Sequence, residues 1–186
     1  LKNAIYINSI FPKVLSDTLL DTKIKIFQIA TDCVFSGSKG NYNENSIHDD
    51  TDLYGISKSL GEIKNKNFYN LRTSIIGREF ETRKSLLEWF LNSKQKTNLK
   101  GFENHYWNGL TTNAFGEIIY TLIKNNIEIP NTIHIVPKDK VNKYDLLQMF
   151  NEKYNMKFKI KKFKTEIKVD RSLNSIYSKK LKIIWK

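Results

Sequence analysis

Short apolar runs of strand length alternate along the chain with longer segments of helical periodicity, and this alternation constrains the fold more than any other feature. The strand-like runs are rich in β-branched and aromatic residues and occupy 24–30, 68–76 and 132–136. Helical spacing covers 52–64, 84–94, 113–126 and 142–154, and Pro12 is expected near the start of an earlier helix. Strands that alternate with helices in this way are typical of a parallel sheet with right-handed crossovers. The sequence therefore predicts an α/β fold.

The bulk composition predicts a soluble, folded protein of a reducing compartment. The 186 residues are 40% hydrophobic and 12% aromatic, which excludes a disordered chain. No apolar run approaches the roughly 18 residues that span a bilayer, so we expect no membrane partner. The single cysteine, Cys33, excludes an internal disulfide and fits a cytoplasmic protein.

The charge of the chain leaves two classes of anionic partner open. There are 31 Lys and Arg residues against 19 Asp and Glu, a formal net charge of +12. A basic surface can bind nucleic acid, but these lysines are scattered along the chain, and a positive field favours an anionic small substrate equally well. We therefore expect no nucleic-acid partner. The three histidines (His48, His105 and His134) have no metal-ligand spacing, so no metal site is expected.

Three residues are placed for proton-transfer chemistry. Thr31 follows the first strand, at the carboxyl end where ligands bind in open α/β sheets. Tyr54 and Lys58 are four residues apart, so they share one face of the helix predicted over 52–64. A tyrosine has an unperturbed pKa near ~10, and a nearby ammonium would lower that pKa toward working pH. Such a phenol can exchange a proton with a substrate oxygen that Thr31 also hydrogen-bonds.

The spacing of the tyrosine and the lysine is weak evidence without this setting. Tyr120 and Lys124 have the same spacing inside an amphipathic helix, with no polar strand end before them. We interpret this second pair as structural. The first pair differs because a strand, a Thr-Asp step and a long Gly-, Ser-, Asn- and Asp-rich loop over 36–52 precede it, and long loops of this kind usually carry function.

Four motifs together resemble a known family. They are Thr31-Asp32-Cys33-Val34-Phe35-Ser36-Gly37, Tyr42-x-Glu44, Tyr54-Gly55-Ile56-Ser57-Lys58 with Gly61-Glu62, and Leu71-Arg72-Thr73-Ser74 with Gly77. In this order and spacing they are similar to the extended short-chain dehydrogenase/reductase superfamily, and within it to the dTDP-4-dehydrorhamnose reductase (RmlD-like) branch. The similarity covers nearly the whole chain.

The resemblance implies a fold in two parts. It implies a Rossmann-like parallel sheet lacking its first βα units over 1–80, and a small C-terminal α/β substrate-binding lobe over most of 81–186, with a strand near 132–136 returning to the sheet. The glycine-rich turn that brings the backbone to a cofactor pyrophosphate in this superfamily does not occur in the sequence. We therefore expect the 186 residues to be an N-terminally truncated form that is inactive alone.

The resemblance also implies the site residues. The catalytic residues would be Thr31, Tyr54 and Lys58. The residues that hold NADPH or NADH would be Tyr54, Lys58, Asn8, Thr73 and Ser74. The residues that bind a nucleotide-diphosphate sugar would be Asp32, Val34, Phe35, Trp107, Thr111 and Arg171. Arg171 would meet a phosphate or a carboxylate, whereas Arg72, inside a strand, is expected to pair with a buried acid.

The reaction that follows is reduction of a 4-keto nucleotide sugar for surface polysaccharide synthesis, with a homodimer as a possible assembly. A sugar-nucleotide epimerase or dehydratase of the same superfamily stays open, because Asp32 beside the strand-end threonine suits a dehydratase as well as a reductase. A non-catalytic sugar-nucleotide-binding subunit is the second alternative, although the presence of Thr31, Tyr54 and Lys58 together argues against it. The sequence leaves open which sugar and which nicotinamide cofactor are used.

Overall fold

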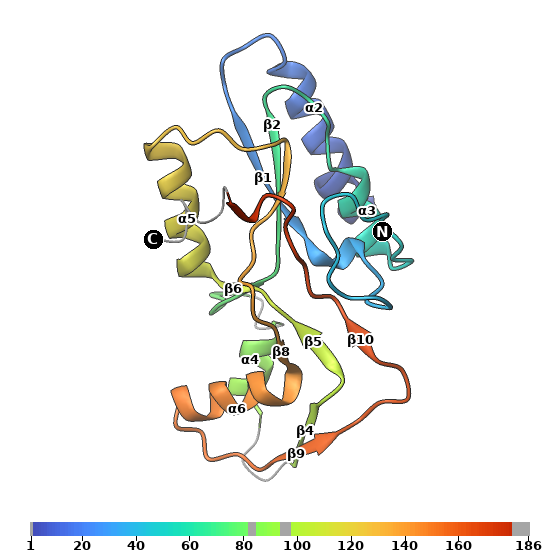
Figure 1. The fold of residues 1–186 in the computed structure, drawn as a ribbon, viewed down its shortest axis with the longest axis vertical. Helices are drawn as coiled ribbons and strands as arrows, with labels where there is room; N and C mark the ends of the chain where they lie inside the picture. The colour runs from blue at the N-terminus through green and yellow to red at the C-terminus, as the bar shows by residue number, and fades with distance from the viewer. Residues whose placement is uncertain (1, 82–84, 94–97, 180–186) are drawn as a thin grey trace.

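A three-stranded parallel sheet organises the upper part of the molecule in Figure 1. The computed structural model describes residues 2–81, 85–93 and 98–179. The sheet has the order β1-β2-β7, with β1 (Ile26–Thr31), β2 (Phe68–Thr73) and β7 (Thr132–His134) all parallel. Thr31 pairs with Thr73 in register, so the carboxyl ends of β1 and β2 lie side by side. The predicted α/β fold with a parallel sheet is confirmed.

Helices flank this sheet on both sides. A continuous helical segment, α1 (Lys2–Ile5), a π-helical turn (Tyr6–Ile10) and α2 (Phe11–Thr18), lies beside α3 (Leu53–Leu60), and α5 (Thr112–Lys124) stands across the sheet from them (Figure 1). The core between sheet and α5 contains Leu71 and Ile133 against Phe115, Ile118 and Leu122, all nearly inaccessible to solvent. Burial of this apolar surface is the main stabilising term for such a layer.

The first helical segment continues through the position where a helix start was predicted. Pro12 is the second residue of α2, and the π-helical turn directly before it carries the chain through without a break. Proline has no N–H to donate to the carbonyl four residues earlier, which is that of Asn8. A side chain on Gly61 would collide with this same Asn8 carbonyl, so the end of α3 packs closely against the first helical segment at this position.

The lower part of the molecule has its own core. It comprises α4 (Leu86–Leu91), α6 (Lys143–Lys153) and the strands β4 (Leu99–Phe102), β5 (His105–Trp107), β8 (Val141–Asn142), β9 (Ile160–Phe163) and β10 (Val169–Asp170). These strands form a β10-β5-β8 sheet and a parallel β4–β9 pair. Side chains of α4 and α6, among them Phe90 and Phe150, pack together beneath them.

The connection between the two parts differs from the prediction. A single strand was expected over 68–76, but β2 ends at Thr73, and β3 (Ile75–Ile76) pairs instead with β6 (Leu110–Thr111). The chain thus leaves the main sheet at Ser74, and this places Ser74 at the junction of the two parts. The division of the chain into two domains near residue 80 stays a prediction. Two elements from later in the chain, α5 and β7, pack with the upper part.

Helix lengths also differ from their predictions. The helix expected over 52–64 ends at Leu60, because Gly61 closes it against Asn8. Asn142 caps α6 as predicted, by accepting a hydrogen bond from the amide of Asp145 at 2.8 Å. The expected ends of the helix over 84–94 lie outside the described residues, within which α4 covers Leu86–Leu91. None of the described helices is both long and apolar enough to cross a membrane.

Candidate functional site

The site begins where β1 ends. Thr31 is the last residue of β1, and its hydroxyl accepts a hydrogen bond from the amide of Cys33 at 3.1 Å, which caps a 3-10 turn over Asp32–Val34. The start of α3 lies directly against this turn. A side chain on Gly55 would collide with the Cys33 carbonyl oxygen, so glycine next to Tyr54 permits the close approach.

This approach brings Tyr54 to Thr31, as predicted. Tyr54 begins α3 against the turn that follows Thr31, and its side chain stays 45% exposed toward solvent. Burial raises the pKa of Tyr54, the nearby Cys33 and Asp32 raise it further, and the nearby Thr31 hydroxyl only partly opposes them. The expectation that an ammonium lowers this pKa is therefore wrong for the ligand-free protein. The phenol is therefore protonated at neutral pH.

The position of the Lys58 ammonium explains why the pKa of Tyr54 is not lowered. It lies one turn along α3 from Tyr54, but its ammonium donates to the backbone carbonyl of Ile29 in β1 at 3.1 Å. Burial lowers the pKa of Lys58, and Glu62 partly opposes this. One donor of the ammonium is thus used to tie α3 to β1, which leaves two N–H groups available to a ligand.

Asp32 is a buried carboxyl group beside Thr31. Its side chain is 5% exposed, and burial raises its pKa. The nearby Arg171 and the side chains of Thr31, Cys33 and Ser74 oppose this increase. The Thr31 hydroxyl donates to Asp32 at 3.3 Å, so the carboxyl group is held within its own turn.

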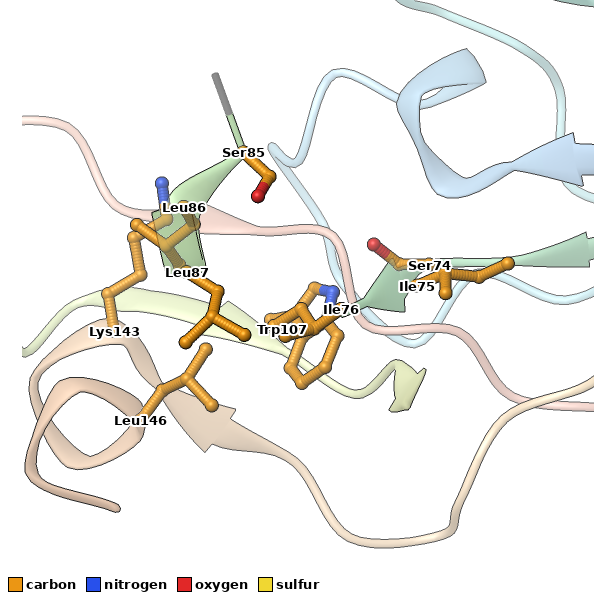
Figure 2. A pocket seen from close by; sticks show the side chains of 9 residues that line it. All are labelled: Ser74, Ile75, Ile76, Ser85, Leu86, Leu87, Trp107, Lys143 and Leu146. Carbon is orange, nitrogen blue, oxygen red and sulfur yellow. The ribbon is translucent and has the colours of Figure 1, made fainter. Parts of the chain in front are cut away.

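A cavity of about 190 Å³ opens beside Ser74. Figure 2 shows Ser74 and Ile76 on one side, Trp107 from β5 in the middle, and Lys143 and Leu146 from α6 on the other side. The rest of the lining is Ile75, Ser85, Leu86 and Leu87. An apolar cavity with a few polar groups at its edge is typical of a small-molecule site. Trp107 therefore lines the same cavity as Ser74, and its predicted contact with a substrate stays a prediction.

Arg171 reaches the same region from the C-terminal segment. Its guanidinium donates to a carboxylate oxygen of Asp50 at 3.1 Å and to the sulfur of Cys33 at 3.7 Å. Its Nε is buried and has no hydrogen-bond partner among the described residues. Arg171 thus uses one edge to pair with a carboxylate, and a further donor remains unused.

Val34 and Phe35, which were predicted to bind substrate, lie in the protein core instead. They are 1% and 0% exposed and belong to a small core with Tyr42 and Leu173. The Phe35 ring stacks on Tyr42 with centroids 4.3 Å apart. Their side chains are therefore core residues rather than substrate contacts, because no part of them is accessible to a ligand.

Three further residues that were predicted to bind cofactor or substrate lie at different distances from the cavity beside Ser74. Asn8 donates to the Ser57 hydroxyl at 3.0 Å and so joins the first helical segment to α3. Thr73 is 1% exposed between β1 and the junction. Thr111 caps α5 and lines a separate apolar groove of about 600 Å³ on the α6 side of Trp107, rather than the cavity beside Ser74.

A buried polar network supports the sheet behind the site. Arg72 pairs with Glu62 through two hydrogen bonds of 2.7 and 2.6 Å, which confirms the predicted pairing with a buried acid. A third Arg72 contact reaches His134 Nε2 at 3.0 Å, and His134 Nδ1 lies 2.8 Å from the carbonyl of Asn174. Glu44 of the predicted Tyr-x-Glu motif accepts from the His134 amide at 2.9 Å.

Lys143 is the site residue that the sequence did not indicate. It is one of 31 basic residues and directly follows the cap Asn142, so no local signal distinguishes it. By contrast, Tyr120 is 62% exposed on α5, with Lys124 5.3 Å from its ring, as expected for a structural pair. The described residues contain no cluster of metal-binding side chains.

Comparisons with known proteins agree with this geometry. The family model of the RmlD substrate binding domain matches residues 1–181. No curated protein matches the chain. Many solved structures do: a hypothetical dTDP-4-dehydrorhamnose reductase from Sulfolobus tokodaii has a TM-score of 0.77 at 24% identity, with 98% of this chain and 66% of that chain covered.

Two structures from Bacillus anthracis are also similar. A dTDP-4-dehydrorhamnose reductase solved with NADP has a TM-score of 0.73 at 17% identity, covering 90% of this chain and 62% of that one. A dTDP-glucose 4,6-dehydratase solved with NAD has a TM-score of 0.74 at 14% identity, covering 98% and 62%. The chain spans less than two thirds of the length of these three proteins. At such identities the likeness shows a Rossmann-like fold and no more.

Proposed function

Because the chain belongs to the family of the RmlD substrate binding domain, we propose that the protein reduces a keto group of a nucleotide sugar with NADPH or NADH. The observation that carries this proposal is the close approach of the start of α3, which carries Tyr54, to the turn that follows Thr31 at the carboxyl end of β1. Two hydroxyl groups that meet at one point can bind a single carbonyl oxygen. We place the protein in the cytoplasm, where nucleotide sugars and reduced nicotinamide are available.

Each residue of this group then has a role. Tyr54 donates a proton to the carbonyl oxygen, and the raised pKa keeps the phenol protonated for this task. Thr31 hydrogen-bonds the same oxygen and holds it against the phenol. Asp32, whose pKa is raised by burial, stabilises the turn that carries Thr31 through its hydrogen bonds with Thr31 and Cys33.

The residues present fit the ribose and nicotinamide end of a dinucleotide. When bound, the reduced nicotinamide supplies the electrons for the reduction. Lys58 has two N–H groups left after its bond to Ile29, and these suit vicinal ribose hydroxyls. Thr73 ends β2 and Ser74 follows it, at the neighbouring strand end where ligands bind in such sheets. Asn8 holds α3 in place through Ser57 rather than contacting the cofactor.

Substrate binding is assigned to the junction. Trp107 offers an apolar surface, and Arg171 offers an unused donor toward an anionic group.

A dehydratase or epimerase on the same nucleotide-sugar class is the second candidate, because the raised pKa of Asp32 also suits an acid that protonates a leaving hydroxyl. The absence of nucleic-acid and membrane partners, and a homodimer, stay predictions.

The test is turnover by the full-length protein. Tyr54→Phe should lower the rate of NADPH oxidation with a 4-keto nucleotide sugar by about 100-fold or more, since it removes a positioned general acid, and cofactor affinity should hardly change. Tyr120→Phe is the matched control, because it removes a phenol with the same Tyr-x-x-x-Lys spacing far from the site. Equal effects of the two substitutions would contradict the proposal. Product analysis by mass separates reduction, which adds two hydrogens, from dehydration and epimerisation.

A further inference from the structure

The lower end of the molecule carries a concentration of lysines that the proposed function does not use. Within 157–168 only Glu166 is acidic, and six residues are lysines, all of them exposed: Lys157, Lys159, Lys161, Lys162, Lys164 and Lys168. They lie in and beside β9, which together with β4 forms the lower end of the molecule in Figure 1, away from α3 and the site.

The lysines of β9 lie on both faces of the strand. Ile160 packs into the lower core, so Lys161, the next residue, points to the opposite face. Lys162 returns to the face of Ile160, where its ammonium lies 5.2 Å from the ring of Tyr144 on α6 and 3.2 Å from the Glu103 carboxylate. The strand therefore presents positive charge to either side of the two-stranded sheet.

Most of these cations have no counter-charge. Lys161 is directly opposite Lys100 of β4, and like charges in this arrangement repel. Lys168 lies 3.7 Å from the Asp170 carboxylate, but among the described residues neither Lys161 nor Lys100 has an ion pair. The same is true of Lys157, Lys159 and Lys164. An acidic ligand along β9 would relieve this repulsion.

One edge of β9 also offers backbone hydrogen-bonding groups. The carbonyls of Lys159 and Phe163 accept from amides at the start of β4 and directly after its end, at 3.0 and 2.9 Å. Alternation along a parallel strand then directs the N–H and C=O groups of Ile160 and Lys162 to the opposite edge. No strand within the described ranges pairs with β9 at that edge. An exposed edge of this kind can accept a further strand.

The free edge and the charges together favour one class of partner. A peptide strand complements both the donors and the acceptors of the edge, whereas the phosphates of a nucleic acid only accept. A membrane surface contacts one face of a protein, but Lys161 and Lys162 lie on opposite faces. Edge lysines also oppose pairing of β9 with a second copy of this chain.

We propose that β9 binds an extended acidic segment of another protein by strand addition, with Lys159 and Lys161 beside its carboxylates. Backbone pairing at the free edge supplies affinity, and the lysines select acidic sequences. The inference does not depend on the proposed function, because β9 lies away from Thr31 and Tyr54 (Figure 1).

Fluorescence anisotropy of the full-length protein tests this, with a labelled synthetic peptide in which glutamate alternates with threonine. The double variant Lys159→Gln, Lys161→Gln should weaken binding about tenfold, because two cross-strand pairs of opposite charge are lost. The matched control is Lys23→Gln with Lys124→Gln, which removes two exposed lysines of the upper part and should have no effect. Methylation of alternate peptide nitrogens keeps every charge, removes backbone donors, and should also weaken binding about tenfold.

Four results would overturn the inference. They are a wild-type protein that does not bind the peptide, equal affinity for the methylated peptide, equal losses in the two double variants, and binding of oligothymidylate or phosphatidylglycerol vesicles at least as tight as that of the peptide. The last would assign the lysines to a nucleic acid or a membrane. The methylated peptide is tested on the wild type, so this comparison does not depend on how the variants fold. Turnover of a nucleotide sugar should be the same in all variants.

Discussion

Protonation of His134 should destabilise the protein as the pH falls from about 6.5 to about 4. The ring is completely buried, and burial lowers its pKa to about 4 from an ordinary value of 6.5. Nδ1 lies 2.8 Å from the Asn174 carbonyl and must donate, so Nε2 must accept from Arg72 at 3.0 Å. This arrangement requires a neutral imidazole, because a second ring proton would point at a guanidinium.

The magnitude follows from the linkage between protonation and folding. A folded-state pKa below the unfolded-state value means that the unfolded chain binds the proton more tightly. The contribution of His134 is therefore fully present above pH 6.5 and is lost progressively down to about pH 4. The difference between a pKa of 6.5 and one of about 4 corresponds to roughly 3 kcal/mol in the free energy of unfolding, at 1.36 kcal/mol for each pKa unit. Glu44, which binds the His134 amide, has a lowered pKa and loses its own contribution at lower pH.

Urea unfolding between pH 4 and 8 measures this effect. His134→Gln supplies an acceptor for Arg72 without a titrating ring, so its free energy of unfolding should change less steeply below pH 6.5 than that of the wild type. His105→Gln is the control, because His105 is only half buried on β5 and contacts the Thr165 hydroxyl. A His134 ring that titrates near pH 6.5 by NMR, or parallel pH profiles in wild type and His134→Gln, would refute the reasoning.

Three further substitutions probe the site and its support. Lys58→Ala should reduce both turnover and NADPH affinity in kinetic and fluorescence titrations, and loss of turnover alone would argue against its assignment to the ribose. Gly55→Ala places a methyl group against the Cys33 carbonyl, so chemical unfolding should show a loss of about 1–3 kcal/mol, and an unchanged stability would show that the approach of α3 is not tight. Arg72→Leu leaves the buried Glu62 carboxylate unpaired and should cost about 3–5 kcal/mol, whereas the double variant with Glu62→Leu should cost less than the sum of the single changes.

The sequence predicted that Thr31 and Tyr54 lie close together because the geometry of this pair is local. Thr31 ends a strand, Tyr54 begins a helix, and these two facts follow from hydrophobic periodicity and a turn-rich loop between them. Gly55 completes the approach, and it is adjacent to the tyrosine in the motif. The direction of the Tyr54 pKa shift was not predictable in the same way, because it depends on where the Lys58 ammonium points. That direction is set by a carbonyl of β1, across the helix–sheet contact.

Residues whose role depends on the second part of the molecule were predicted less well. Val34 and Phe35 follow Thr31 closely in sequence, and the family resemblance implied substrate contact for them. Their burial is caused by Tyr42 and Leu173, which close over them from two distant segments. Lys143, by contrast, was not predicted to line the cavity. Only the packing of α6 beside Trp107 brings this lysine there. In both cases the deciding contacts are long-range, and no periodicity encodes them.

The long loop over 36–52 explains how the two halves of the site are kept in register. Tyr42 exchanges backbone hydrogen bonds with the C-terminal segment, donating to Ser172 and accepting from Asn174 at 3.0 and 2.7 Å. Asp50, near the end of the same loop, holds the Arg171 guanidinium two residues before Asp52 caps α3 through the amide of Tyr54. Arg171 is therefore anchored to the loop that also leads into α3, so one stretch of chain fixes the positions of both Arg171 and Tyr54.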